Sequence, residues 1–291
     1  MVITSLRGGL GNQLFQVAAG IRLAAVHGTV LKLDLSPLED ETFFTPRSYE
    51  LAPFWIDVAE ASAAEVEALA GSRRKRLLAW LPGRARSQAD TAANERHFHF
   101  DSDVLCLDDD VCLRGYWQSE RYFADAATLV RKALRFKEPA TARNAELAAE
   151  IAGPSAVSLH VRRGDYVSNP SAREIHGLCT LDYYQRAVAI LCEQVVDPFF
   201  YIFSDEPDWV RANLRVDAPF AIIDHNGTDA CHEDMRLMSL CAHHIIANSS
   251  FSWWGAWLGA NSEKIVIAPE RWFAVSDRDT RDVVPEAWTR T

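Results

Sequence analysis

The stretch IANSSFSWWGAWLGAN, residues 246–261, decides the fold class of this chain. An apolar run ends at Asn248, and a tryptophan-rich pattern with helical spacing begins near Ser250. The pattern predicts a strand that leads directly into a helix. Serine or asparagine at such a junction can cap the helix, and the backbone N–H groups of its first turn favour an anion such as phosphate.

A second polar cluster, HVRRGD at 160–165, leaves the apolar run 156–159 in the same way. From there on the pattern alternates between strands and helices. The expected strands are 156–161, 199–204, 219–223, 243–247 and 264–268, and the expected helices are 181–196, 207–214, 231–242 and 250–260. This alternation predicts a parallel, doubly wound α/β sheet, in which ligands bind beyond the carboxyl ends of the strands.

Four expected strands are followed by polar clusters, and we expect these clusters to converge on one crevice. They are His160–Asp165, Ser204–Glu206, Asp224–Asn226 and Asn248–Ser250. Two of them have the character of anion sites, which suggests a ligand that carries phosphate.

The N-terminal part opens with a βαβ pattern of strand 2–5, helix 10–26 and strand 29–35. A less regular middle, 37–110, separates it from an expected strand at 111–116 and helix at 120–136. Proline and glycine at 139, 153 and 154 indicate a boundary. We therefore predict two Rossmann-like domains, residues 1–150 and 151–291, that face each other across a cleft.

Composition narrows the function. The 291 residues are 48% hydrophobic, with a net charge of −10, which argues against a nucleic-acid partner and requires any anion site to be built locally from arginines. Arg162 and Arg163 are the obvious pair. The N-terminus has no charged leader with an apolar core, and no window approaches the ~20 apolar residues of a membrane span, so we expect a cytoplasmic protein.

One basic segment departs from the acidic balance. Arg73 to Arg76 precede a run containing Leu77, Leu78, Trp80 and Leu81, which is a mixture typical of a peripheral contact with the inner face of a membrane. A solvated helix end has the same composition, and short basic runs are common.

Five motifs together carry a family resemblance. They are GGLGNQLFQ (8–16), GYWQSERYF (115–123), HVRRGDY (160–166), FSDEPDW (203–209) and EDMRLMSLCAHHIIANSSFSWWGAWL (233–258). In this order they resemble the bacterial α-1,2-fucosyltransferases of glycosyltransferase family 11. The resemblance implies a GT-B fold, GDP-L-fucose as donor, inversion at the anomeric carbon, no metal ion and no other cofactor. It also implies a glycan acceptor that ends in galactose, such as an O-antigen unit.

The chemistry assigns roles within the second cluster. A metal-free enzyme must supply fixed positive charge where GDP departs, and the planar fork of arginine suits phosphate oxygens. We assign Arg162 to the β-phosphate and Arg163 to its support or to a nearby carboxylate. Gly164 would let backbone approach the phosphates. The resemblance implies that His160 contacts the nucleoside, although a satisfied core histidine is the alternative.

The other clusters complete the predicted donor site. Asn248, Ser249 and Ser250 should hold the pyrophosphate at the helix start, with Phe251 facing the sugar and the tryptophans in the core. Asp205 is expected beside them. Asp224 could accept the N–H groups of guanine, or it could simply cap a turn.

The N-terminal glycine loop lacks the GxGxxG spacing of a dinucleotide site. As the lip of a GT-B cleft, Gly9, Asn12 and Gln13 would reach the donor sugar or phosphate. A structural tight turn would use the same glycines.

The acceptor hydroxyl must lose a proton, and the candidate bases are Asp165, Glu174, His176 and Glu233. Asp165 is the first choice as the catalytic carboxylate, although orienting an arginine would suit it equally. Asp101-Ser102-Asp103 matches the DxD pattern that holds a metal in many sugar transferases, but we interpret it as a loop.

Three alternatives stay open: a transferase for another GDP-sugar, a non-catalytic protein that binds a sugar nucleotide or glycan, and a nicotinamide oxidoreductase with a weak glycine fingerprint.

Overall fold

The computed structural model describes residues 1–39, 47–70, 92–151 and 153–291. The chain forms two compact units, Met1–Arg135 and Phe136–Thr291. The division between the compact units falls at residue 135, whereas the sequence predicted a boundary near 150. The reason is that Leu147 and Ile151 of the intervening helix pack in the core of the second unit. The basic segment Arg73 to Arg76 lies outside the described residues.

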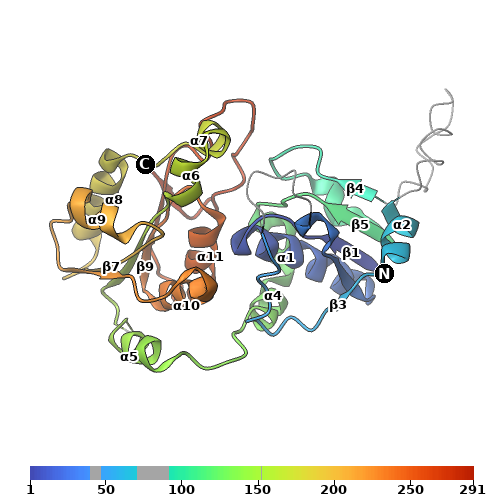
Figure 1. Ribbon diagram of the computed structural model, residues 1–291, viewed down its shortest axis with the longest axis horizontal. Helices are drawn as coiled ribbons and strands as arrows, with labels where there is room; N and C mark the ends of the chain where they lie inside the picture. The colour runs from blue at the N-terminus through green and yellow to red at the C-terminus, as the bar shows by residue number, and fades with distance from the viewer. Residues whose placement is uncertain (40–46, 71–91, 152) are drawn as a thin grey trace. The chain divides into compact units, whose positions relative to one another are not determined.

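Unit 1 contains a parallel sheet of five strands (Figure 1). The strands are β1 (Val2–Ser5), β2 (Leu31–Asp34), β3 (Ala59–Glu60), β4 (Ala92–Asn94) and β5 (Val111–Arg114). Its helices are α1 (Leu10–His27), α2 (Ala63–Ala70) and α4 (Ala127–Ala133), together with short 3-10 turns at Ser36–Leu38, Ser102–Cys106, Glu120–Tyr122 and Ala124–Ala126. The expected helix at 120–136 is thus broken. Ser119 caps a 3-10 turn, and Phe123 leaves helical geometry with a φ of −144°.

The strand order of unit 1 is β3-β2-β1-β5-β4. From β1 the chain continues outward through β2 to β3. It then crosses to the opposite edge of the sheet at β4 and comes back to β5, which lies beside β1, so β1 and β5 flank the point where the winding reverses. Alternate side chains of β1 point to opposite faces: Ile3 packs with Leu69 of α2, whereas the Thr4 hydroxyl donates to the Gln16 carbonyl of α1 over 3.3 Å. The loops that follow β1 and β5 therefore flank the topological switch point, where α/β sheets bind ligands.

Unit 2 contains a parallel sheet of six strands in the order β11-β10-β9-β6-β7-β8. The strands are β6 (Ala156–Val161), β7 (Phe199–Ser204), β8 (Phe220–Ile223), β9 (His243–Ile245), β10 (Val266–Ala268) and β11 (Thr289–Arg290). The helices are α5 (Ala142–Ile151), α6 (Gly164–Ser168), α7 (Pro170–His176), α8 (Leu181–Gln194), α9 (Pro207–Asn213), α10 (Cys231–Leu240) and α11 (Ser250–Leu258), and a 3-10 turn covers Thr228–Ala230. The predicted α/β class with parallel sheets is confirmed.

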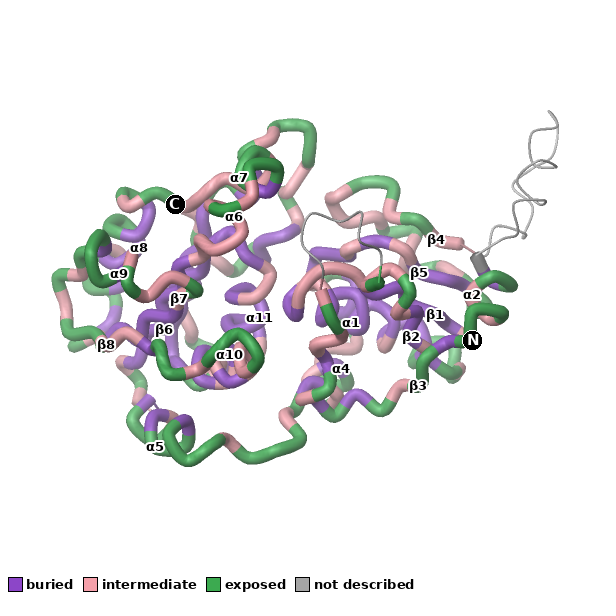
Figure 2. Tube along the Cα trace, in the orientation of Figure 1, coloured by how far each residue is buried: buried purple, intermediate pink, exposed green. Residues whose placement is uncertain are grey.

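The two faces of the unit 2 sheet are covered by different helices. Val157 and Leu159 pack with residues of α8, whereas Tyr201 and Phe203 pack with residues of α5 and α10. Figure 1 shows α8 and α9 on one side of the strands and α10 and α11 on the other. All six residues of β6 are buried, as Figure 2 shows in purple. The strand is buried on both faces, so its two polar side chains, Ser158 and His160, are buried together with its apolar ones.

The winding of unit 2 reverses between β6 and β9, which are neighbours in the sheet. The loops after these two strands carry the HVRRGD and NSS clusters. Topology alone thus brings the two anion-type clusters of the sequence to one switch point. Among the described residues, no helix is both long enough and apolar enough to span a membrane.

Candidate functional site

The guanidinium of Arg162 lies between two carboxylates. Its Nη2 is 2.5 Å from Oδ1 of Asp165, and its Nη1 is 2.7 Å from Oδ2 of Asp205. Burial lowers the pKa of the guanidinium, but the two carboxylates outweigh burial and the net shift is upward. Arg162 is therefore a permanently charged group in a fixed orientation at the end of β6.

Asp205 organises this cluster from the end of the adjacent strand, β7. Besides Arg162, it accepts a hydrogen bond of 2.9 Å from the backbone N–H of Arg163. Gly164, with a φ of +23°, leaves room for it: a Cβ at this position would lie 2.5 Å from Oδ2 of Asp205. The glycine of the motif thus accommodates a carboxylate of the protein itself. Burial raises the pKa of the Asp205 carboxyl despite the attraction of Arg162.

Arg163 is held separately. Its Nε donates to Oε2 of Glu206 over 2.8 Å, and its guanidinium lies 3.7 Å from the ring centroid of Trp209 on α9. An ion pair combined with a cation–π contact fixes an arginine firmly. Of the two predicted roles for Arg163, the structure favours the partner of a nearby carboxylate.

The cluster carries a net negative charge. Two arginines, 162 and 163, face three carboxylates, Asp165, Asp205 and Glu206, which leaves one negative charge when all are ionised. An anionic ligand that approached Arg162 would therefore have to replace one of its carboxylate partners.

An aromatic stack supports Arg162 from the side. The guanidinium lies 5.3 Å from the centroid of Tyr166, and the Tyr166 ring stacks on His176 with centroids 4.4 Å apart and an angle of 6°. The His176 ring in turn contacts Phe273, with centroids 5.3 Å apart. Burial lowers the pKa of His176 to about 4, so this ring is neutral at neutral pH.

Asn248, after β9, ties the loops of the switch point together. The Tyr166 hydroxyl donates to its carbonyl over 3.4 Å, and its side-chain amide donates to the carbonyls of His176 (2.9 Å) and Trp272 (3.3 Å). The thiol of Cys179 donates to its Oδ1. Its buried side chain therefore supports the fold of the site.

The helix start expected near Ser250 is confirmed: α11 begins there. Ser249, the N-cap residue, is buried, and within the described chain its side chain makes no capping hydrogen bond. Trp253, Trp254 and Trp257 are buried, which confirms the prediction that the tryptophans are core residues. Phe251 is half-buried and tilts against His160, with ring centroids 5.6 Å apart.

His160 is the penultimate residue of β6. Its side chain lies on the face of the sheet that α10 and α11 cover. The ring is 4% exposed, and its Nδ1 is buried with no hydrogen-bond partner among the described residues. Burial, assisted by Arg162, lowers the pKa of His160 to about 3. One ring nitrogen of this buried histidine is thus left without a partner in the described part of the chain.

Three of the four expected clusters meet at this switch point, and the fourth does not join their contacts. Asp224 forms an ion pair with Arg211 of α9. The next two residues turn to α5: His225 contacts Asn144 over 2.7 Å, and Asn226 donates to Asn144 over 3.1 Å. These bonds hold α5 on unit 2.

The predicted residues of the N-terminal loop lie at the switch point of unit 1. Gly9 is the N-cap of α1, and Asn12 accepts a hydrogen bond of 2.7 Å from Gln118 in the loop after β5. Gln13 is fully buried, and its amide bonds the carbonyls of Gly8 and Ser48 and the backbone N–H of residue 50. The Gln13 side chain therefore fixes the loop and is not directed at a ligand.

The remaining candidate bases and the DxD pattern lie elsewhere. Glu174 is exposed on α7, and Glu233 is buried on α10 in an ion pair with Arg236 (3.0 Å). Asp101 and Asp103 both bind Arg96, at 2.5 and 2.9 Å. The segment predicted to be a loop forms the start of a 3-10 turn, with Asp101 as its N-cap, and an arginine engages both carboxylates.

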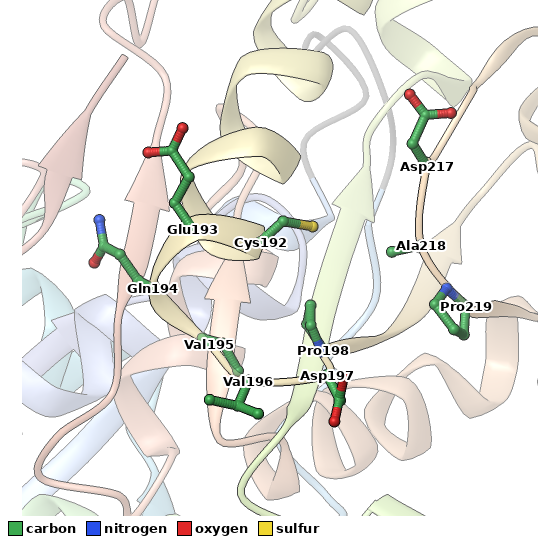
Figure 3. Close-up of a pocket in the computed structure, with 10 residues that line it drawn as sticks. All are labelled: Cys192, Glu193, Gln194, Val195, Val196, Asp197, Pro198, Asp217, Ala218 and Pro219. Atoms are coloured by element: carbon green, nitrogen blue, oxygen red, sulfur yellow. The ribbon is translucent and has the colours of Figure 1, made fainter.

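Figure 3 shows a hollow in unit 2 at the amino ends of β7 and β8, which is the opposite end of β7 from Asp205. It measures about 500 Å³. Its lining residues are Cys192, Glu193, Gln194, Val195, Val196, Asp197, Pro198, Asp217, Ala218 and Pro219. Three carboxylates, with no lysine or arginine among these described residues, make it unsuitable for a phosphate-bearing ligand.

Sequence reasoning missed the two features that hold Arg162. The pairing of Asp205 with Arg162 and the stack of Tyr166 on His176 were not expected. The adjacency of two strand-end clusters hinted at the first. No local pattern indicates the second, because the stack joins two helices through their faces.

Comparisons with known proteins identify the family of this chain. The sequence profile described as "Glycosyl transferase family 11" matches residues 103–290. The chain is 33% identical to an alpha-1,2-colitosyltransferase of Escherichia coli, over all of this chain and 98% of that protein. It is 28% identical to the O-antigen biosynthesis glycosyltransferase WbnK of Escherichia coli, over 94% of this chain and 95% of the relative.

Among solved structures, the fucosyltransferase NodZ from Bradyrhizobium is 16% identical, with a TM-score of 0.47, over 87% of this chain and 91% of that one. The resemblance seen in the five motifs is confirmed by the profile match and by the full-length relatives. This chain is a glycosyltransferase that belongs to glycosyl transferase family 11.

Proposed function

We propose that this protein transfers L-fucose from GDP-L-fucose to the 2-hydroxyl of a terminal galactose, with inversion and without a metal ion. The observation that carries the proposal is the guanidinium of Arg162, oriented at the switch point of unit 2 beside the start of α11. A fixed cation of this kind can stabilise the charge that develops on a departing diphosphate. Membership of family 11 and the α-1,2 specificity in the names of relatives support the same reaction.

We assign the donor residues as follows. Arg162 binds the β-phosphate, and the backbone around Ser249, Ser250 and Phe251 binds the pyrophosphate. His160, whose Nδ1 is unpaired among the described residues, is directed to the nucleoside. Asp224 remains our candidate for guanine, which requires its carboxylate to be shared with Arg211.

The reaction balances within these residues. The acceptor oxygen attacks the anomeric carbon, the bond between that carbon and the phosphate oxygen breaks, and the electron pair leaves with GDP. Because Arg162 has two carboxylate partners, the diphosphate replaces one of them. We infer that it replaces Asp165, since Asp205 is also anchored to the backbone of Arg163. The released Asp165 carboxylate then accepts the proton of the acceptor hydroxyl.

We also propose that the two units form a GT-B pair, with unit 1 on the acceptor side. Support comes from unit 1 having its own parallel sheet and a polar loop at its switch point. A glycan that ends in galactose, as in an O-antigen repeat, is the proposed acceptor, consistent with an O-antigen glycosyltransferase among the relatives.

A second donor has a specific observation in its favour, because one full-length relative is named a colitosyltransferase. Colitose is L-fucose without the 3-hydroxyl. A site that hydrogen-bonds this hydroxyl would reject the deoxy sugar by a factor of about 10⁴. The ratio of kcat/KM for the two GDP-sugars therefore identifies the natural donor.

The deciding experiment measures product from GDP-L-fucose and from GDP-colitose, with lactose and N-acetyllactosamine as acceptors, in the presence and absence of EDTA. We expect 2-O-fucosylated product and no effect of EDTA. Loss of activity with EDTA would contradict a metal-free mechanism, and product only from GDP-colitose would replace the donor. In the same assay, an Asp165→Asn variant with full turnover would remove Asp165 as the base.

The basic segment Arg73 to Arg76 carries a separate proposal of contact with a membrane surface, based on its sequence alone. Replacing its four basic residues with glutamine should reduce binding to anionic lipid vesicles and leave activity on lactose unchanged. Undiminished vesicle binding would refute this contact.

A further inference from the structure

The residues around Arg162 include the imidazole of His176, which has no role in the proposed reaction. His176 lies on α7, away from the motif that carries Arg162 in the sequence, yet its ring covers the Tyr166 ring at a centroid distance of 4.4 Å. The sequence made it a candidate base. Its stacked position and its low pKa of about 4 argue against that role, since a group so easily deprotonated is a weak base at neutral pH.

The stack has a clear order. Arg162 faces Tyr166, Tyr166 faces His176, His176 faces Phe273, and the guanidinium of Arg278 lies 4.9 Å from the centroid of Phe273. Two cations thus enclose three aromatic rings. Burial and the two arginines disfavour a charged imidazole here more than Asp165 favours it, so this position suits a neutral flat ring.

The backbone at His176 is fixed as firmly as its ring. Its carbonyl accepts a hydrogen bond of 2.9 Å from the side chain of Asn248, and the carbonyl of the neighbouring Ile175 accepts one of 2.9 Å from Ala274. The Tyr166 hydroxyl meets the carbonyl of Asn248 from the other side. The stack therefore links the loop after β6 with the loop after β9.

We propose that His176 is a positioning residue, which acts through the face of its ring to hold Tyr166 against Arg162. This inference rests on the proposed binding of a diphosphate at Arg162. An aromatic pair contributes about 0.5–1.5 kcal/mol beyond the burial of its area. Loss of the stack should therefore weaken diphosphate binding by a factor of about five, and no titration of His176 is involved.

The test compares two substitutions, with GDP and inorganic pyrophosphate as separate calorimetric probes. His176→Phe keeps a flat ring and should bind both probes within about twofold of the wild type, with an unchanged pH profile of kcat. His176→Ala removes the ring and should raise both dissociation constants about fivefold. His97→Ala is the matched control, because His97 stacks on His99 in unit 1 (centroids 4.9 Å apart), and it should leave both constants unchanged.

Each outcome decides the inference. If His176→Phe loses turnover as His176→Ala does, the imidazole has a chemical role and the inference is wrong. If His176→Ala binds like the wild type, the stack does not position Arg162. Phe273→Leu, at the next ring, guards against local misfolding: it should weaken binding less than His176→Ala, with the unfolding midpoint checked for every variant.

Failure of the proposed function looks different. If the wild type binds pyrophosphate but not GDP, the proposed donor is wrong. The inference about His176 still holds in that case, provided that the variants bind pyrophosphate in the expected order of affinity. A wild type that binds neither probe would reject both.

Discussion

The two switch points of this molecule share a topology and differ in chemistry. In unit 1 the loops after β1 and β5 are joined by neutral amides: Gln16 bonds both backbone groups of Arg7 and the carbonyl of Gly115, and Gln118 bonds Asn12. In unit 2 the ion pairs of Arg162 join the loops after β6 and β7, and hydrogen bonds of Asn248 join the loop after β9 to the stacked Tyr166 and His176. In both units the first strand lies beside a later strand, but the loops there are linked by amides in unit 1 and by charged and aromatic groups in unit 2.

The helix starts differ in the same sense. The backbone N–H of Leu10, at the start of α1, donates to a carboxylate oxygen of Glu50 over 2.8 Å. A carboxylate of the protein thus occupies the position that an anionic ligand would take. At the start of α11, the side chain of Ser249 provides no such cap within the described residues. A carboxylate of the protein thus caps the start of α1, whereas within the described residues the side chain of Ser249 does not cap the start of α11.

The largest expected effect tests the charged edge directly. Arg162→Lys keeps the charge but loses the planar fork that two oxygens can share, and turnover should fall by about 10³. The control is Arg143→Lys, since Arg143 also pairs with a carboxylate three residues away, Glu146, but on the exposed surface of α5. Initial rates with GDP-L-fucose and lactose measure both. Turnover of the Arg162 variant within tenfold of the wild type would show that the fork is dispensable.

The next effect tests the amide edge. Gln16→Leu leaves the backbone groups of Arg7 and Gly115 without their buried partner, and the free energy of unfolding should fall by about 3 kcal/mol. Denaturant unfolding measures this loss. GDP binding at a temperature where the variant is folded should be unchanged, because unit 2 holds the proposed nucleotide site. A weaker GDP affinity without a loss of stability would mean that unit 1 takes part in nucleotide binding.

A smaller effect tests the fit between Gly164 and Asp205. Gly164→Ala places a Cβ 2.5 Å from Oδ2 of Asp205, so the carboxylate must move and carry Arg162 with it. We expect the GDP dissociation constant to rise about tenfold. Gly227→Ala is the control, since a Cβ there meets nothing within 4 Å among the described residues and should change neither affinity nor stability. Equal affinities of the two variants would contradict the proposed role of Asp205.

The smallest effect concerns acid stability. Burial lowers the pKa of His244 in unit 2 to about 3, so folded His244 stays neutral while unfolded His244 binds a proton below its ordinary 6.5. The unfolded state then binds more protons, and stability falls as the pH drops from 6.5 toward 3. Burial raises the pKa of Asp234 to about 6. Between pH 3.8 and 6 the folded protein therefore holds a proton on Asp234 that the unfolded chain releases, and this partly offsets the loss of stability.

A comparison of variants isolates this term. His244→Gln should reduce the slope of the unfolding free energy against pH by about 1 kcal/mol per pH unit between pH 4 and 6. Parallel curves for wild type and His244→Gln would show that His244 does not titrate on unfolding.

Much of the fold was predictable where the pattern is local. The strands 156–161 and 199–204 have the predicted bounds, because short, mainly apolar segments with turn residues on both sides leave few alternatives. The helix expected at 120–136 was wrong, since its periodicity persists while Ser119 and Phe123 divide the backbone into shorter turns. The compact units divide at residue 135 and not near 150 because Leu147 packs in the core of unit 2, a long-range contact that no local pattern records.

The candidate site shows the same limit. That Arg162 follows a buried strand, and that Ser250 starts a helix, could be predicted from neighbouring residues. That Asp205 lies beside Arg162 while Asp224 does not join the cluster could not be predicted. Both follow strands with equally polar ends, and only the order of the strands and the direction of each side chain separate them.

The sequence by itself determined the strands β6 to β10 and the helices α8 to α11 of unit 2, and which charged residues stand at their ends. Those features depend on spacings of two to four residues along the chain. Only the tertiary structure decided that β6 and β9 are neighbours, that Arg162 has two carboxylate partners, and that His176 offers its face and not its nitrogen. The physical reason is that these choices depend on contacts between residues far apart in the chain, whose energies no local pattern records.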